Sequence, residues 1–256
     1  MCDKGFLSKE DLSLYSSKLS FKDFDYKNVY GTKEYTEWND KYIYVFDEQY
    51  LDDEDITELP DGYCLYQRSY LHETDNVVHA SGLMCELRKD GECIYKFVAT
   101  DDHHNPYTFF INHSNGHRYY PFNVDLYGIS YIDVDTLEVF NYVPAGLPNS
   151  YGIPCGESFI VTNIFYDPKS DLVAYEGCYW ADMSDVMIGR LDDPLNFDPH
   201  LISISRVIDH EDLGCCDIDF VSWEEDGITV KADGDNGVKD VKITKAVLDK
   251  AAGIKN

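Results

Sequence analysis

The residues best suited to chemistry in this sequence are carboxylates and imidazoles gathered near one predicted turn. Asp101-Asp102-His103-His104 precedes His113 and His117, and these two histidines flank Ser114-Asn115-Gly116. Carboxylate and imidazole groups together suit zinc, manganese or iron. The group predicts a metal site, which would serve a metal-dependent hydrolase, formed by Asp102, His104, His113 and His117. Adjacent residues of a strand point to opposite faces, so we favour the other interpretation, a polar loop beside a histidine-bearing turn.

A second group of chemically suggestive residues lies further along the chain. Glu176, Asp182 and Asp185 surround Tyr179 and Trp180. Carboxylates beside aromatic rings are what a glycosidase uses. The pattern supports a carbohydrate-active or carbohydrate-binding protein as an alternative, although an acidic, tyrosine-rich chain produces such groups by chance.

Other catalytic motifs are absent from the sequence. The 256 residues contain no phosphate-binding loop, nucleophile elbow, HExxH pair or dinucleotide fingerprint. This absence favours binding over catalysis, and we expect no cofactor.

Acidic side chains are concentrated in two segments. Residues 47–61 hold eight acids and no basic residue, and residues 192–240 hold fourteen acids against three basic residues. Charge runs of this kind usually lie on solvated surface, so we expect 47–61 to be a loop. We also expect the two segments to form one acidic face that docks a basic protein, as an inhibitor, an immunity-type protein or a scaffold would. The side chains assigned to this face are Asp52, Asp53, Glu54, Asp55, Glu224, Glu225 and Asp226.

The overall charge points to the same class of partner. The formal net charge is −27, and the pI is near 4.4. Nucleic-acid binding depends on Lys and Arg releasing counterions from phosphates, and an acidic field repels a polyanion. The same field raises the association rate with a basic partner, by about tenfold to a thousandfold.

The termini and the cysteines bear on the compartment. The start, MCDKGFLSKEDL, has no apolar signal-peptide region, and no run approaches the length of a membrane span. Eight cysteines include no CxxC pair and lie mostly inside strand-like runs, which predicts buried free thiols. We therefore expect a soluble, cytoplasmic protein that does not bind membranes.

The elements that must position these groups are strands, and the clearest of them lie between Ser158 and Pro194. Three runs, 159–165, 172–178 and 186–191, carry the β-branched and aromatic residues that suit strands. Asp167-Pro168 starts the first turn, because aspartate accepts hydrogen bonds from the turn backbone and proline fixes φ. The stretch predicts a three-stranded antiparallel meander.

This order of strands and turns resembles one blade of a WD-repeat-type β-propeller. Residues 158–194 carry it as YDPKSD, LVAYEG and DVMIGRLDDP, and residues 126–143 have a similar arrangement. The resemblance implies a ring of such blades. Without it, the same residues equally predict an antiparallel meander in a sandwich or half-barrel.

Further hairpins recur along the chain and make the expected fold all-β. Turns containing glycine separate apolar runs within 83–99, 107–122 and 218–232. Tyr42 to Phe46 also predicts a strand, in a stretch from 21 to 50 that is crowded with aromatic residues. Such crowding forms a stacking surface for sugars, a peptide groove or a core, and we favour the core.

The length suggests one domain. A chain of 256 residues buries enough surface to be stable without disulfide bonds or structural metals, so we expect a single domain over 1–256. Glycine and proline concentrate in the loop 145–156, which would separate two halves, 1–144 and 157–256. Short helices are predicted near the two termini, at 7–19 and 244–252.

Overall fold

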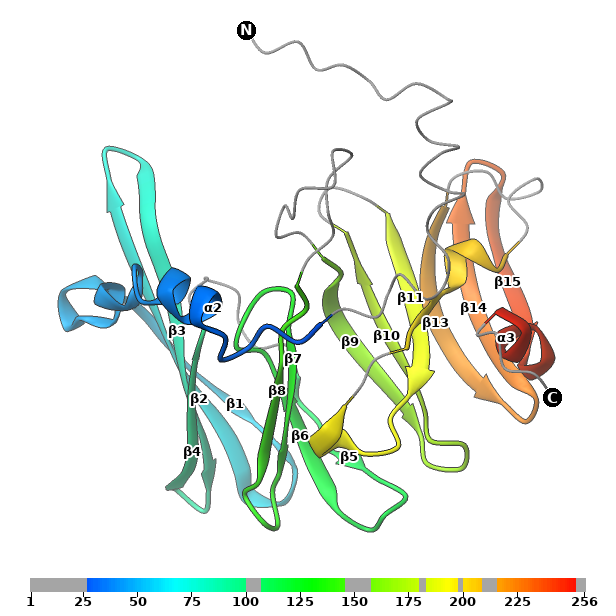
Figure 1. The fold of residues 1–256 in the computed structure, drawn as a ribbon, viewed down its shortest axis with the longest axis horizontal. Helices are drawn as coiled ribbons and strands as arrows, with labels where there is room; N and C mark the ends of the chain where they lie inside the picture. Colours follow the sequence, from blue (N-terminus) through cyan, green and yellow to red (C-terminus); the bar gives the residue numbers. More distant parts are fainter. Residues whose placement is uncertain are drawn as a thin grey trace, which may run out of the picture.

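The fold is a row of antiparallel sheets. A computed structural model describes residues 27–99, 107–145, 158–179, 183–197, 200–208 and 216–251. Within these residues there are four sheets, and in each of them the strands are neighbours in sequence order. Figure 1 shows the sheets side by side along the longest axis, with the first and fourth at opposite ends. The prediction of an all-β antiparallel meander is confirmed.

The first sheet consists of two long hairpins that share a strand, with an added edge strand. Its members are β1 (Leu51–Glu58), β2 (Tyr63–Thr74), β3 (Val77–Lys89) and β4 (Glu92–Ala99). The predicted turn between β3 and β4 is confirmed, because Asp90 and Gly91 have φ of 50° and 87°. Asp75 and Asn76, with φ of 53° and 61°, make the matching turn between β2 and β3. Positive φ at both central residues is what a type I′ hairpin turn requires.

The second sheet contains two of the predicted hairpins in shortened form. Its strands are β5 (Ile111–Asn112), β6 (Arg118–Phe122), β7 (Ile129–Asp133) and β8 (Val139–Tyr142). The hairpin predicted within 107–122 has its first strand only at Ile111–Asn112, so a strand is wrong for residues 107–110. Tyr107 is buried, and its carbonyl accepts a hydrogen bond from Tyr120 Oη (3.0 Å). That bond satisfies the carbonyl in place of a ladder partner.

The third sheet contains the meander that the sequence predicts most clearly. Its strands are β9 (Ile160–Asp167), β10 (Leu172–Cys178), β11 (Ser184–Arg190) and β12 (Ile202–Ser203). The predicted Asp167 turn is confirmed, since the Asp167 carboxylate accepts from Lys169 N–H (3.2 Å) and from Ser170 Oγ (2.6 Å). A Cβ at Gly177 would lie 1.9 Å from Ile160 O, so only glycine allows β9 and β10 to approach here.

The fourth sheet and a helix end the described chain. The sheet contains β13 (Cys216–Glu224), β14 (Gly227–Gly234) and β15 (Gly237–Thr244), followed by α3 (Lys245–Ala251). The predicted hairpin and C-terminal helix are confirmed. The helix predicted over 7–19 lies outside the described residues, as does most of the loop 145–156. Among the described helices, none has the length and apolar character that crossing a membrane requires.

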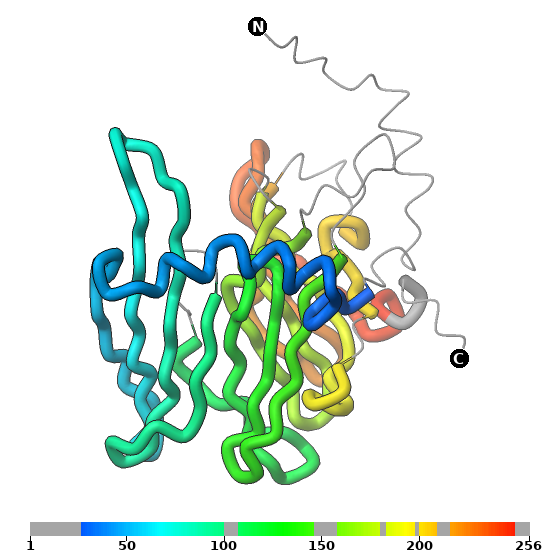
Figure 2. The backbone as a smooth tube through the Cα atoms, turned by 60° about the vertical axis from the view of Figure 1, so that its left-hand side comes forward, coloured from blue at the N-terminus to red at the C-terminus, as the bar shows by residue number. Residues whose placement is uncertain are grey.

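Residues 27–50 form a segment that we call the strap. It contains α2 (Lys33–Asn39) and two 3₁₀ turns, η2 (Ile43–Phe46) and η3 (Glu48–Tyr50). Figure 2 shows the strap running across the first and second sheets. Asn28 fixes one end, because its Nδ2 donates to Asn141 O (2.8 Å) and its Oδ1 accepts from Val143 N–H (3.1 Å). The other end is fixed by Val45, which is fully buried in a cluster with Tyr70 and Ala80.

The strap corrects two expectations. The strand predicted over Tyr42 to Phe46 is wrong, because a 3₁₀ turn places Val45 against the first sheet while Ile43 stays exposed. The interpretation of the aromatic stretch as core is wrong for Tyr30, Trp38 and Tyr44, whose exposed fractions are 42%, 57% and 42%. The strap covers the sheets from outside, so only part of each ring finds a surface to bury against.

Two buried clusters hold the sheets together. The larger lies between the first three sheets and takes residues from both sides of the loop 145–156, and the smaller lies between the third and fourth sheets. Within the larger cluster, the Oη atoms of Tyr131 and Tyr175 are 2.6 Å apart and connect the second sheet to the third. Alternate residues of β10 serve different clusters, because Tyr175 belongs to the larger and Ala174 to the smaller.

The row of sheets does not close into the ring that the propeller resemblance implies. In the described chain, no strand pairs with the outer edge of β1 or of β15, and these strands lie at opposite ends of the row (Figure 1). Each buried cluster joins sheets that follow one another in sequence, and neither joins the first to the fourth. Closure would need that missing contact.

Candidate functional site

The predicted metal ligands do not all lie within the described residues. Asp102 and His104 fall outside them, so the four-residue site stays a prediction. His113 is buried, and its Nδ1 accepts a hydrogen bond from Asn115 N–H (3.2 Å). The proton is therefore on Nε2, which donates to Leu191 O (2.6 Å). With both nitrogens engaged, His113 fastens its turn to the third sheet and offers no free lone pair to a metal.

His117 belongs to a different group of side chains. Its Nδ1 lies 2.7 Å from Asp133 Oδ2, and Asp135 completes a set whose ligand atoms are all within 4.8 Å of one another. Carboxylate and imidazole at this spacing are able to hold a divalent cation. Arg118 already lies 3.8 Å from Asp135, however, and its charge opposes a cation there.

Asp133 explains why this group is held together. The side chain is 2% exposed, and its Oδ1 accepts from the backbone N–H groups of Asp135 (2.8 Å) and Thr136 (3.2 Å). Burial raises the pKa of Asp133, but these N–H groups and His117 together outweigh it, so the pKa lies below its ordinary value. The carboxylate therefore organises the turn between β7 and β8.

The carboxylates proposed for carbohydrate chemistry also have structural partners. Asp182 and Trp180 lie outside the described residues. Glu176 Oε2 accepts from Phe220 N–H (2.8 Å) and so connects the third sheet to the fourth. Asp185 is buried and accepts from Ser203 Oγ (2.6 Å), which fixes β12 beside β11. Both groups are held by the fold rather than directed into an open space.

The first acidic segment is mainly a strand, contrary to the expected loop. Leu51–Glu58 pairs along β2, and its burial pattern is exposed at nearly every position. Cross-strand pairing overcomes the low strand propensity of acids, because Glu54 lies opposite Arg68, with Arg68 Nε 2.9 Å from Glu54 Oε1. Arg68 also binds Glu48 at 2.8 Å, and these bonds lower the pKa of Glu48.

The acids of β1 differ in whether they have a counter-ion. Glu54 forms an ion pair with Arg68 and also accepts a hydrogen bond from Tyr66 Oη. Within the residues that the structure describes, no ion pair involves Asp52, Asp53 or Asp55. Asp52 occupies a bulge, because the register passes from Leu51 to Asp53 without a partner for it. Three exposed carboxylates on a sheet edge therefore have no counter-ion within the described chain.

The second predicted acidic group lies elsewhere. Glu224, Glu225 and Asp226 surround the turn between β13 and β14, and hydrogen bonds from Thr229 Oγ1 (2.6 Å) and Ser222 Oγ (3.0 Å) lower the pKa of Glu224. This turn belongs to the fourth sheet, at the other end of the row from β1 (Figure 1). The structure thus places the predicted residues on two separate surfaces.

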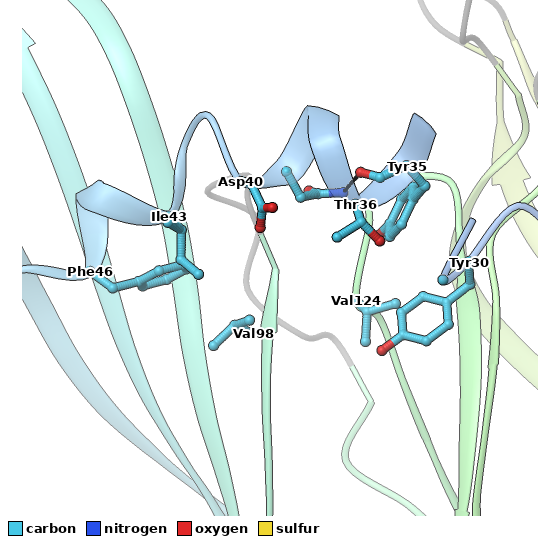
Figure 3. A pocket seen from close by; sticks show the side chains of 10 residues that line it. Tyr30, Tyr35, Thr36, Asp40, Ile43, Phe46, Val98 and Val124 are labelled. Carbon is cyan, nitrogen blue, oxygen red and sulfur yellow. Dashed lines mark hydrogen bonds between the residues drawn. The ribbon is translucent and has the colours of Figure 1, made fainter. Parts of the chain in front are cut away.

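A pocket of about 220 Å³ lies under the strap and was not predicted. Figure 3 shows strap side chains facing Val98 of β4 and Val124, which follows β6. The aromatic crowding between residues 21 and 50 is the signal that pointed toward it. Its walls meet only in the tertiary structure, because Val98 and Val124 are far from the strap in sequence.

Comparisons with known proteins do not assign a family. No protein-family model matches the sequence, and the comparison with curated proteins found no match. Among solved structures, MPT-1, a GDP-Man-dependent mannosyltransferase from Leishmania mexicana, matches with 11% sequence identity and a TM-score of 0.32. The match covers 76% of this chain and 68% of that chain. A similarity this weak carries no argument about function.

Proposed function

We propose that the chain is a non-catalytic acidic protein that engages a basic protein partner, in the manner of an inhibitor, an immunity-type protein or a scaffold. The observation that carries this proposal is the set of exposed carboxylates at Asp52, Asp53 and Asp55, which lack counter-ions in the described chain, on an edge strand of a chain with net charge −27. A basic surface supplies the missing counter-charges and gains rate from the long-range field.

The edge of β1 adds geometry to the charge. A strand without an outer neighbour presents a row of backbone N–H and C=O groups that another chain is able to pair with. Like charges across such a pairing are destabilising, so the carboxylates discourage a second acidic copy and favour a basic segment. The proposed contact is therefore selective for the sign of the partner's charge.

The state of the cysteines fits a cytoplasmic setting, which we include in the proposal. Among the cysteines that the structure describes, Cys64, Cys85, Cys93 and Cys178 are free thiols. Burial raises the pKa of the Cys85 thiol, so that group stays protonated and unreactive. Free thiols persist in reducing compartments.

The test begins with affinity capture from the native lysate, at low and then high salt, followed by measurement of association rates with the purified partner. We expect basic proteins, and an association rate that falls steeply with salt while dissociation changes less, because charges are screened over about 8 Å at physiological ionic strength. Partners without basic character would overturn the proposal.

A pair of variants with equal charge change separates the β1 contact from general attraction. The variant Asp52→Asn, Asp53→Asn removes two charges from β1, and the control Glu225→Gln, Asp226→Asn removes two from the β13–β14 turn. Glu54 and Glu224 are left intact because both have structural partners. We expect the β1 variant to slow association several times more than the control. Equal effects would mean that the acidic surface acts only through net charge.

A further inference from the structure

The pocket under the strap combines apolar and aromatic side chains with one carboxylate. Ile43 and Phe46 approach it from the strap, and Val98 and Val124 approach it from the sheets. Val98 is an aliphatic residue of β4, yet it is 43% exposed. The apolar surface beneath the strap is open to solvent, so a side chain of another molecule would bury its own apolar surface there.

One wall of the pocket is aromatic. The Tyr30 and Tyr35 rings lie with centroids 5.6 Å apart and an interplanar angle of 48°. The Tyr30 ring is directed toward the space beside Val124 (Figure 3). The face of a tyrosine ring attracts a cation through its quadrupole, and a guanidinium also stacks on it.

A single carboxylate provides the charge. Asp40 lies directly after α2, and Figure 3 shows its side chain pointing from the strap toward Val98. No hydrogen bond or ion pair to the Asp40 carboxylate occurs among the described residues, and no basic side chain lines the pocket. The complementary group therefore has an apolar stem and a cationic head.

The size of the pocket limits the occupant. Pockets for drug-sized ligands measure about 300–1,000 Å³, and this one is smaller, at about 220 Å³. A single long side chain matches that volume. Arginine suits it better than lysine, because its planar guanidinium is able to bond a carboxylate with two parallel N–H groups while stacking on a ring.

We propose that this pocket receives one arginine side chain of the basic partner, with the guanidinium on Asp40 and the tyrosine rings and the stem on Val98 and Val124. The inference rests on the proposed function for the identity of the partner, although the pocket itself is tested without it.

The position of the pocket allows one partner to reach β1 as well. The strap wall at Phe46 is followed after η3 by the start of β1, and β4 lies three strand spacings from β1, about 14 Å across the sheet. An interface of ordinary size, about 800 Å² on each partner, covers that separation. The exposed Trp38 and Tyr44 lie on the same strap, and exposed aromatic residues are enriched among the residues that dominate binding energy.

The first experiment uses the full-length protein and three defined probes, the N-acetyl amides of arginine, lysine and citrulline. Methyl resonances of Ile43, Val98 and Val124 are followed by NMR during titration. We expect saturable shifts with the arginine probe, a weaker response with lysine and none with citrulline, which has the shape of arginine without its charge. Equal shifts with citrulline would overturn the proposal.

Two variants on the strap provide matched controls for charge. Asp40→Asn should weaken binding of the arginine probe by about tenfold or more, because it removes a charge-assisted contact. Glu37→Gln makes the same charge change on the neighbouring turn of α2, where Glu37 pairs with Lys33 (3.5 Å) and does not line the pocket. We expect it to leave the affinity unchanged. Equal effects of the two substitutions would also count against the site.

Measurements with the captured partner separate this inference from the proposed function. If Asp52→Asn, Asp53→Asn slows association but Asp40→Asn does not change the affinity, the arginine site is wrong and the proposed function stands. If the arginine probe saturates the pocket in an Asp40-dependent way but the captured partners are not basic, the proposed function is wrong and the arginine site stands.

Discussion

Val45 anchors the strap, and its truncation to alanine should loosen the roof of the pocket without unfolding the sheets. Val45 is fully buried in a small cluster of its own with Tyr70 and Ala80, apart from the two main clusters. Val45→Ala removes two buried carbon groups, and at about 0.8 kcal/mol for each buried CH₂ the loss is about 1.6 kcal/mol before any cavity cost. Since 1.4 kcal/mol changes an equilibrium constant tenfold, the equilibrium constant for local opening of the strap should rise roughly 15-fold.

Hydrogen exchange read by mass spectrometry measures this opening segment by segment. We expect peptides covering 33–50 to exchange roughly 15-fold faster in Val45→Ala, and peptides covering β9 to β11 to be unchanged. Ile43→Ala is the control, because Ile43 lies in the same 3₁₀ turn and is 59% exposed. Equal acceleration in all four sheets, or an equal effect of Ile43→Ala, would refute the view that one buried side chain fixes the strap locally.

Three further outcomes follow from described contacts. Tyr131→Phe and Tyr175→Phe should each lower the free energy of unfolding in urea by about 1–3 kcal/mol, because each leaves the other buried hydroxyl unpaired. The double variant should lose less than the sum of the two single losses, and additive losses would contradict this. Gly177→Ala should disrupt the pairing of β9 with β10 and greatly reduce the yield of soluble folded protein, because the alanine Cβ would collide with Ile160 O. A melting temperature like that of the natural protein would contradict the close approach of the two strands. The pKa of Asp133 is lowered from 3.8, so its contribution to stability is present above that pH and is lost as the pH falls through the folded-state pKa. The stability difference between the natural protein and Asp133→Asn should therefore shrink below about pH 4 in urea titrations, and a constant difference would contradict the assignment.

Local turn chemistry is the part of the fold that the sequence determines most directly. Asp90-Gly91 and Asp167-Pro168 each prescribe a backbone path through their own φ preferences and hydrogen bonds, so their hairpins are predictable without tertiary information. The β2–β3 hairpin is harder to predict. Its turn, Asp75-Asn76, lacks glycine, and Gln67, which is 2% exposed, interrupts the apolar alternation of β2.

Long-range contacts determine the rest, and no local pattern encodes them. Strand β1 pairs along β2, and Arg68 offers a counter-ion to Glu54 across the sheet, which propensity alone does not show. The role of His113 depends on Leu191 O, 78 residues away in sequence. The pocket likewise forms only where the strap passes over β4, so aromatic composition suggests a surface without locating it.

Both faces of the third sheet are buried, and this has a consequence for how the amino-acid sequence is able to change in evolution or in the laboratory. Val173 and Tyr175 contact one buried cluster and Ala174 the other, although the three are consecutive in β10. The two faces of β10 pack in different buried clusters, and the effects of substitutions at sites without shared packing partners usually add. A combinatorial library is therefore able to vary the two buried clusters separately. Substitutions accumulated in one cluster leave the set of residues tolerated in the other cluster unchanged.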